Sequence, residues 1–378
     1  MTGIVRLSEV ELGELRSSVR SFLEAKSSEE AVRKVIETEP RYDPQVWAQM
    51  AEQLRLPGLI IPEEYGGDGF GQVALAAVLE EMGRALLCSP FFATVVLAAQ
   101  ALLASGDREA CAELLPGIAA GTTTAALAVG EKTGAWDPVQ VETRAVRQGD
   151  DVAGWTLTGT KSFVIDGASA DLLLVIARTT AGPSLFAVDR AATGLSAEPL
   201  EVLDPTRAMA RLRFQGTPAR LVGTDGAGGR LMARVLDLAT AGLAAEQTGG
   251  AERCLESATA YAGTRVQFGR LIGSFQAVKH KCAEMLVQVE LARASAREAA
   301  QIADTGDEAA FAVASSAAHV CCSRAYMFAA AENIQVHGGI GFTWEHPAHL
   351  YFRRAKSSQL LFGGPAASHE RFLERLGF

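Results

Sequence analysis

Apolar residues recur at spacings of three and four along the first third of the chain, from Ser8 to about Ala120. This spacing places apolar side chains on one face of a helix, so it predicts an N-terminal helical region. The segment RLPGLIIPEEYGGDGFG (55–71) is rich in glycine and proline and is expected to break the helices with a loop. A second break is expected at Ser105-Gly106-Asp107.

The pattern changes between Thr122 and about Thr224, where short runs rich in Val, Leu and Thr alternate with Gly, Pro and Asp. WTLTGTKSFVIDG and ADLLLVIART are two such runs. They predict six to eight short β-strands. The connections leave no room for crossover helices, so the sheet should be largely antiparallel.

Helical spacing returns from about Gly229 onward, and the helices it predicts are long. One apolar stripe comprises Val278, Cys282, Met285, Leu286 and Val289. Thr305-Gly306 should separate this helix from the next, which is expected over 307–336. Four such helices form an antiparallel bundle. The predicted fold is therefore α+β, with an N-terminal helical domain (1–120), a mostly antiparallel β-domain (121–226) and a C-terminal four-helix bundle (227–378).

The composition fits such a fold, since 48% of the 378 residues are hydrophobic. A formal net charge of -9 and the absence of long Lys/Arg runs argue against a nucleic-acid partner. The longest nearly apolar stretch, Phe91 to Ala104, is shorter than the ~20 residues of a membrane span. The N-terminus shows no secretory signal, which makes the cytoplasm the expected location. The six cysteines lack C-x-x-C spacing and predict buried thiols rather than disulfides or metal ligands.

The segment TRVQFGRLIGSFQ (264–276) places two arginines, an aromatic residue and a glutamine around two glycines at the join of two helices. Free N–H groups at a helix N-terminus and a guanidinium fork both match phosphate oxygens, so a pyrophosphate could bind here. The alternative is a polar turn whose arginines face water.

The segment NIQVHGGIGFTW (333–344) carries Gly338, Gly339 and Gly341 directly after a helix. Glycines let a ligand's phosphate or adenine approach the backbone, and Gln335 and His337 offer polar contacts. Alone, the segment equally suits a helix C-cap followed by a turn.

Taken together, five segments in order resemble the acyl-CoA dehydrogenases over nearly the whole chain: IIPEEYGGDG, GTKSFVIDGASAD, RVQFGRLIGSFQ, IQVHGGIGFTW and LYFRRAKSSQLL. The resemblance implies FAD as cofactor. It assigns Arg265, Phe268, Gln276, Gln335, Gly338 and Gly339 to the adenosine-diphosphate half of an FAD bound mainly by the neighbouring subunit. Phe163 stands where the family usually has a tryptophan near the flavin ring.

The resemblance further implies an obligate oligomer, a homo- or heterotetramer built as a dimer of dimers. The family removes a proton from the α-carbon and a hydride from the β-carbon of an acyl-CoA. Hydrogen bonds to the thioester oxygen stabilise the developing enolate. Electrons then pass to an electron-transfer flavoprotein or a similar acceptor.

The chain departs from the family at both usual positions of the catalytic base. The Tyr-Glu-Gly-Thr context reads Leu361-Phe362-Gly363-Gly364, where only the Phe362 backbone N–H could still support the thioester oxygen. The other position, counted back from Arg265, falls on Ala239. Glu246 stands two turns further along the same helix face, about 10 Å away.

Glu246 lies among small and apolar neighbours in AGLAAEQTGGA, with no Lys or Arg three or four residues away. A carboxylate in an apolar, partly buried setting suits a general base, so we predict this role for Glu246. The alternative is a glutamate hydrogen-bonded at a helix contact. Gly249-Gly250 beside it could widen the cavity for a branched or ring-bearing acyl chain.

Two further departures leave other functions open. The family's Thr-Glu-Pro-Gly-x-Gly-Ser-Asp stretch reads GEKTGAWD (130–137), and Ile165 replaces a threonine at the flavin edge. A non-catalytic subunit that completes the FAD site of a catalytic partner chain in a heterotetramer is therefore the main alternative to a dehydrogenase. An oxidase or oxygenase on the same scaffold is a third.

Overall fold

A computed structural model describes residues 4–149 and 154–378. The chain divides into two compact units. The sheet unit comprises Met1–Arg6, Val35–Gly71 and Cys88–Ala239, and the bundle unit comprises Leu7–Lys34, Gln72–Leu87 and Thr240–Phe378. The domain boundaries expected near residues 120 and 226 remain predictions.

The N-terminal third is helical, as its apolar spacing predicted. Its elements are α1 (Glu9–Lys26), α2 (Glu29–Val35), α3 (Pro44–Leu54), η1 (Leu56–Gly58), η2 (Glu63–Tyr65), α4 (Gln72–Arg84), η3 (Phe92–Ala99), α5 (Gln100–Ser105) and α6 (Arg108–Ala119). Ser8 and Glu11 form a capping box that starts α1. Asp107 caps α6, so the break expected at 105–107 is confirmed.

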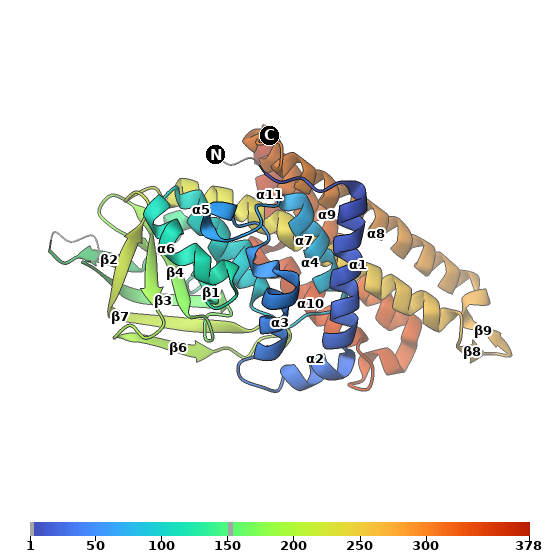
Figure 1. Cartoon of the computed structure of the whole chain (residues 1–378). Coiled ribbons are helices and arrows are strands. Elements are labelled where there is room, and N and C mark those ends of the chain that lie inside the picture. The colour runs from blue at the N-terminus through green and yellow to red at the C-terminus, as the bar shows by residue number, and fades with distance from the viewer. Residues whose placement is uncertain (1–3, 150–153) are drawn as a thin grey trace. The chain divides into compact units, whose positions relative to one another are not determined.

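The β-strands form the core of the sheet unit (Figure 1). They are β1 (Ala125–Ala128), β2 (Arg144–Arg147), β3 (Trp155–Ile165), β4 (Leu172–Arg178), β5 (Pro183–Asp189), β6 (Leu195–Pro199) and β7 (Met209–Val222), with η4 (Pro138–Gln140) in a loop. In the described part of the chain the strand order is β1-β4-β2-β3-β7-β5, and β6 pairs with β7. Two pairings of β4, with β1 and β2, are parallel, whereas the other pairings are antiparallel as predicted.

Long helices make up most of the bundle unit (Figure 1). They are α7 (Gly228–Ala262), which crosses from one unit to the other, α8 (Gln276–Ala303), α9 (Glu308–His337), α10 (Ala348–Leu360) and α11 (Gly364–Arg375). The hairpin β8 (Val266–Gln267) and β9 (Arg270–Leu271) with η5 (Ile272–Ser274) joins α7 to α8, and η6 (Gly338–Phe342) and η7 (Leu361–Gly363) precede α10 and α11. The predicted break between α8 and α9 is confirmed. No helix in the described part of the chain is long and apolar enough for a membrane crossing.

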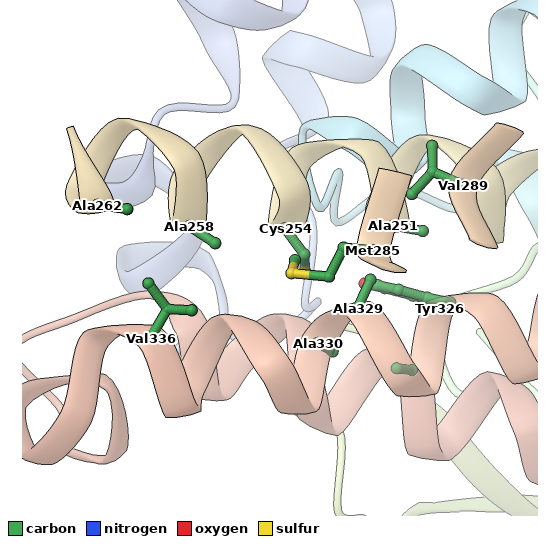
Figure 2. Close-up of a cluster of buried hydrophobic side chains, with 11 residues drawn as sticks. Ala251, Cys254, Ala258, Ala262, Met285, Val289, Tyr326, Ala329, Ala330 and Val336 are labelled. Atoms are coloured by element: carbon green, nitrogen blue, oxygen red, sulfur yellow. The ribbon is translucent and has the colours of Figure 1, made fainter. Parts of the chain in front are cut away.

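Small side chains let the bundle helices approach closely. Figure 2 shows Ala251, Cys254 and Ala258 of α7 directed toward α9, where Ala329 and Ala330 lie. On α8, Met285 and Val289 are fully buried, but Leu286 is 50% exposed and does not belong to the buried stripe in which it was predicted. A residue one position beyond Met285 points about 100° away from it around the helix, which explains the difference.

Candidate active site

Glu246 lies on α7 inside the bundle unit, and its side chain is almost fully buried. Arg354 of α10 is also buried, and its Nη1 donates to Glu246 Oε1 at 2.9 Å. No Lys or Arg stands three or four residues from Glu246 along α7, but this buried arginine pairs with it from another helix. The arginine comes from a helix 108 residues further along the chain, and a search along α7 alone cannot find it.

A buried ion pair of this kind fixes both side chains. Leaving one partner buried without the other is strongly unfavourable, so each holds the other in place. The guanidinium cannot lose its proton in a protein, so the carboxylate is the only member of the pair that can exchange one. The pair thus provides an oriented carboxylate in a dry setting.

The glycines beside Glu246 do not open a cavity, contrary to the expectation from the sequence. A Cβ on Gly249 would stand 1.7 Å from the carbonyl oxygen of Glu80 in α4. A Cβ on Gly250 would stand 2.4 Å from the Tyr326 ring. From the other side, a Cβ on Gly83 would meet the Glu246 carbonyl oxygen at 1.9 Å. The glycines therefore allow α4 and α7 to cross in backbone contact, which holds Glu246 in position.

The loop at the family's usual base position lies between α10 and α11. Phe362 is buried and adopts a left-handed backbone conformation (φ 61°), followed by Gly363 (φ 110°) and Gly364 (φ 73°). Arg371 Nη2 donates to the Phe362 carbonyl oxygen at 2.9 Å. A non-glycine residue in this conformation is strained, and such strain is concentrated at functional sites.

The β8–β9 hairpin carries the first group of predicted cofactor residues. Phe268 (φ 52°) and Gly269 form its turn, and Phe268 is 91% exposed. Arg265 and Gln276 are also exposed, and Gln276 is the first residue of α8. No side chain in the described residues caps the N-terminus of α8, so its N–H groups can still meet an anion.

The second group lies at the end of α9. Gln335, Gly338 and Gly339 are exposed, and a Cβ at either glycine would meet nothing within 4 Å. His337, expected to offer a polar contact, is instead buried. Its Nδ1 lies 2.8 Å from the Asn333 carbonyl oxygen, and burial lowers its pKa. Its ring packs between Tyr261 and His346, so it supports the segment from inside.

Phe163 lies in the sheet unit, at the end of β3. It is 45% exposed and has φ 56°, and its ring packs against Gly134 in the altered loop 130–137. Ile165 is buried and offers nothing to a ligand. Relative to the pattern that the sequence resembles, the aromatic character at position 163 is kept and the hydroxyl at position 165 is missing.

An ion pair between a fully buried lysine and a partly buried glutamate fastens that loop to β3. The fully buried Lys161 Nζ donates to Glu131 Oε1 and to the Val129 carbonyl oxygen, both at 2.9 Å. Burial lowers the pKa of Lys161 to about 8, although Glu131 partly offsets the effect. Glu131 also accepts from the backbone and the hydroxyl of Thr143. Lys161 and Glu131 stand 30 positions apart in the chain, so the sequence around either residue does not reveal the pair.

These residues fit an FAD molecule by their chemistry. Exposed arginine, glutamine and glycine N–H groups match a pyrophosphate and an adenine, and an exposed aromatic ring matches a flavin. The six predicted adenosine-diphosphate residues all lie on exposed positions of the bundle unit, as residues that complete a neighbouring subunit's site would. Their role in binding the cofactor remains a prediction.

Three family models cover most of the chain. The acyl-CoA dehydrogenase N-terminal domain matches residues 9–122, the middle domain 126–217 and the C-terminal domain 226–375. Among curated proteins, the acyl-CoA dehydrogenase IpdE2 of Mycobacterium tuberculosis is 38% identical over 93% of this chain and 92% of its own length. The acyl-CoA dehydrogenase FadE27 of the same organism is 31% identical over 95% of both chains.

Solved structures agree over almost the full length. A variant of the Tcur3481-Tcur3483 steroid ACAD superposes with a TM-score of 0.88 at 33% identity, covering 97% of this chain and 98% of that one. The ChsE4-ChsE5 complex from Mycobacterium tuberculosis gives 0.88 at 29% identity, with 98% of both chains covered. Butyryl-CoA dehydrogenase from Megasphaera elsdenii gives 0.87 at 25% identity, with 99% and 100% covered. These structures and the present chain share the same order of domains: an N-terminal helical domain, a central β-domain and a C-terminal helical domain.

Proposed function

The chain belongs to the acyl-CoA dehydrogenase family, and we propose that it catalyses FAD-dependent α,β-dehydrogenation of an acyl-CoA thioester with Glu246 as the general base. The observation that carries this proposal is the buried contact between Glu246 and Arg354. It supplies an oriented carboxylate in a chain whose Phe362 and Ala239 cannot accept a proton.

In this mechanism Glu246 removes the proton from the α-carbon, and Arg354 keeps its carboxylate aimed at that atom. The carboxylate is the member of the pair that can accept a proton, because the guanidinium is already fully protonated. The Phe362 N–H supports the thioester oxygen and stabilises the enolate as charge develops on it. When bound, FAD supplies the acceptor for the hydride that leaves the β-carbon.

The adenosine-diphosphate half of the cofactor is assigned to Arg265, Phe268, Gln276, Gln335, Gly338 and Gly339, and the flavin side to Phe163. Arg265 provides a charged donor for a phosphate, and Phe268 provides an aromatic face beyond the tip of its hairpin. Because these side chains project from the chain's own bundle unit, we propose that they complete a site in the neighbouring subunit.

The oligomer is proposed to be a tetramer, with a second, related chain as partner. Exposed apolar side chains follow one side of α8. They include Leu286, Val287 and Leu291, which are 50%, 56% and 54% exposed. Such a row is typical of a helix that packs against another subunit. The name of the Tcur3481-Tcur3483 relative and that of the ChsE4-ChsE5 complex each join two chains, which supports a hetero-oligomer.

We propose that the acyl group of the substrate carries a ring system, because one solved structure with 33% sequence identity is named a steroid ACAD. Electrons would leave the reduced chain through an electron-transfer flavoprotein or a similar acceptor. The substrate class is tested by anaerobic flavin reduction with a series of thioesters that runs from butyryl-CoA to polycyclic acyl-CoA. Faster reduction by straight short chains than by polycyclic ones would refute this part of the proposal.

A second candidate function is the non-catalytic subunit of a hetero-oligomer. The observation that favours it is Phe362 at the usual base position, together with the altered stretch GEKTGAWD (130–137). The chain is to be produced alone and together with a candidate partner chain of the same family. Flavin reduction by acyl-CoA is then measured for each preparation. Activity that disappears with Glu246→Gln in this chain supports catalysis here. Activity that survives this change assigns catalysis to the partner.

A further inference from the structure

A buried polar contact joins α9 to α11 behind the loop 361–364. His319 of α9 is 1% exposed, and its Nδ1 lies 3.2 Å from the Oγ of the buried Ser368 on α11. The Ser368 hydroxyl in turn donates to the carbonyl oxygen of Gly364 at 2.8 Å. Neither side chain belongs to a motif singled out from the sequence.

The direction of these hydrogen bonds can be assigned from their number. A serine hydroxyl has a single hydrogen, and here it goes to Gly364, so His319 Nδ1 carries the proton and donates to Ser368. His319 Nε2 is then a buried acceptor without a partner among the described residues. Burial lowers the pKa of His319 to about 4, and the charge of Arg371 acts in the same direction. The imidazole is therefore neutral near pH 7, and its single N–H group, at Nδ1, donates to Ser368 Oγ.

The loop requires support of this kind because its backbone is strained. Three successive residues have positive φ, and Phe362 is the only one of them that is not glycine. Arg371 holds the Phe362 carbonyl oxygen, and His319 acts at the other end of the loop through Gly364. The Phe362 ring lies with its centroid 6.4 Å from that of His319, so the same histidine also borders the ring.

We propose that His319 is a positioning residue that, through Ser368, fixes the loop 361–364 and so sets the place of the Phe362 N–H. It is buried and acts on the loop through Ser368. Its effect on the loop follows from the contacts above, whereas its effect on the thioester rests on the proposed function.

The first test measures hydrogen exchange of the loop amides in the folded chain at neutral pH. His319→Leu removes the donor, and His319→Asn restores one, because the asparagine amide nitrogen reaches about the place of Nδ1. We expect exchange over 361–368 to rise at least 10-fold in the leucine variant and to stay within about 2-fold of wild type in the asparagine variant. His369→Leu, at an exposed neighbour of Ser368, is the matched control. Unchanged loop exchange in His319→Leu, or an equal rise throughout α8 and α9, would overturn the proposal.

The second test measures steady-state kinetics of the FAD-loaded protein together with any partner chain it needs. We expect His319→Leu to lower kcat at least 10-fold with a smaller change in KM, because a displaced N–H loses more contact with the enolate than with the bound substrate. His319→Asn should recover most of kcat. A loosened loop with unchanged kcat in an active enzyme contradicts the positioning role. An inactive wild type refutes the proposed function instead, and the exchange experiment still decides the role of His319.

Discussion

Each unit of this protein contains a buried ion pair with a 2.9 Å contact, and the two pairs differ in which member can change its charge. In the sheet unit the cation is Lys161, whose pKa is lowered to about 8 by burial. In the bundle unit the cation is Arg354, which stays charged at any ordinary pH. A permanent cation leaves proton exchange to the carboxylate alone, so the second pair suits catalysis.

The carboxylates differ as well. Burial alone would raise the pKa of Glu131, but hydrogen bonds and charge from Lys161 and hydrogen bonds from Thr143 lower it. That carboxylate is committed to holding the loop 130–142 against β3. Glu246 instead lies at the crossing of α4 and α7, in the unit that also contains the Phe362 loop. One pair therefore fastens a loop, whereas we assign the other to the chemistry.

The largest expected effect comes from Glu246→Gln, which removes the basic oxygen but keeps the shape. Turnover should fall by at least the ~10²–10⁴-fold attributed to a positioned base, while FAD and acyl-CoA still bind. Flavin reduction by a saturating thioester measures the loss. A rate close to wild type in a chain that is active alone would move the base to another carboxylate.

Removing only the cation of the Glu246–Arg354 pair should destabilise the fold strongly. Arg354→Met removes the cation beside the buried Glu246 carboxylate, which should lower the free energy of unfolding by about 3–5 kcal/mol. The double variant Glu246→Gln/Arg354→Met should recover much of this loss. Arg353→Met is the matched control, because that guanidinium lies over the Trp344 ring, which is more than half exposed, and its loss should have a small effect. Urea unfolding of wild type, Glu246→Gln, Arg354→Met and the double variant gives the coupling energy between the two side chains, and additive losses would contradict the predicted coupling.

Alkaline pH should separate the two pairs. The folded-state pKa of Lys161, about 8, lies below its ordinary value of 10.5, so the unfolded chain binds this proton more tightly between these pH values. The contribution of Lys161 to stability is therefore lost as pH falls through 8 and gained as pH rises toward 10.5, by up to about 3 kcal/mol. The free energy of unfolding of wild type should therefore rise by that amount relative to that of Lys161→Met as pH increases over this range. Arg354→Met should run parallel to wild type there, and a parallel Lys161→Met curve would show that the lysine is not shifted.

A smaller effect is expected from the exposed hairpin, where no buried charge is involved. Arg265→Ala should lower FAD affinity by about 1.5–3 kcal/mol through the loss of one charge-assisted hydrogen bond. Far-ultraviolet circular dichroism should remain unchanged, since Arg265 is exposed and outside the core. Flavin occupancy after gel filtration reports the change, and full occupancy would remove Arg265 from the cofactor site.

The sequence predicted local structure well because local structure depends on near neighbours. Helix spacing, the stop at Thr305-Gly306 and the Asp107 cap all act within a few residues. The Glu246–Arg354 contact joins residues 108 positions apart, and no periodicity along α7 contains that information. Gly249 and Gly250 were misinterpreted for a similar reason, since the space beside a glycine is filled by another helix and a distant ring.

The candidate site was predictable only where a motif carries it. Phe268, Gly338 and Gly339 were predicted to contact the adenosine-diphosphate half of FAD; they lie on the surface, and their role in binding stays a prediction. His319 and Ser368 lie in ordinary helical sequence, and their meeting behind the loop appears only when α9 and α11 are packed. A polar residue within a mostly apolar helix, such as His319 in α9, is the one sequence signal that could have indicated this contact.

Exchange of the substrate's α-hydrogens tests most directly whether Glu246 removes the α-proton, because it reports proton removal separately from hydride transfer. The FAD-loaded protein, with any partner chain it needs, is incubated in D₂O with a thioester that binds but cannot lose a β-hydride, and deuterium uptake is followed by mass spectrometry. We predict rapid uptake at the α-carbon with wild type and uptake at least 100-fold slower with Glu246→Gln. Uptake by Glu246→Gln at the wild-type rate would contradict the account.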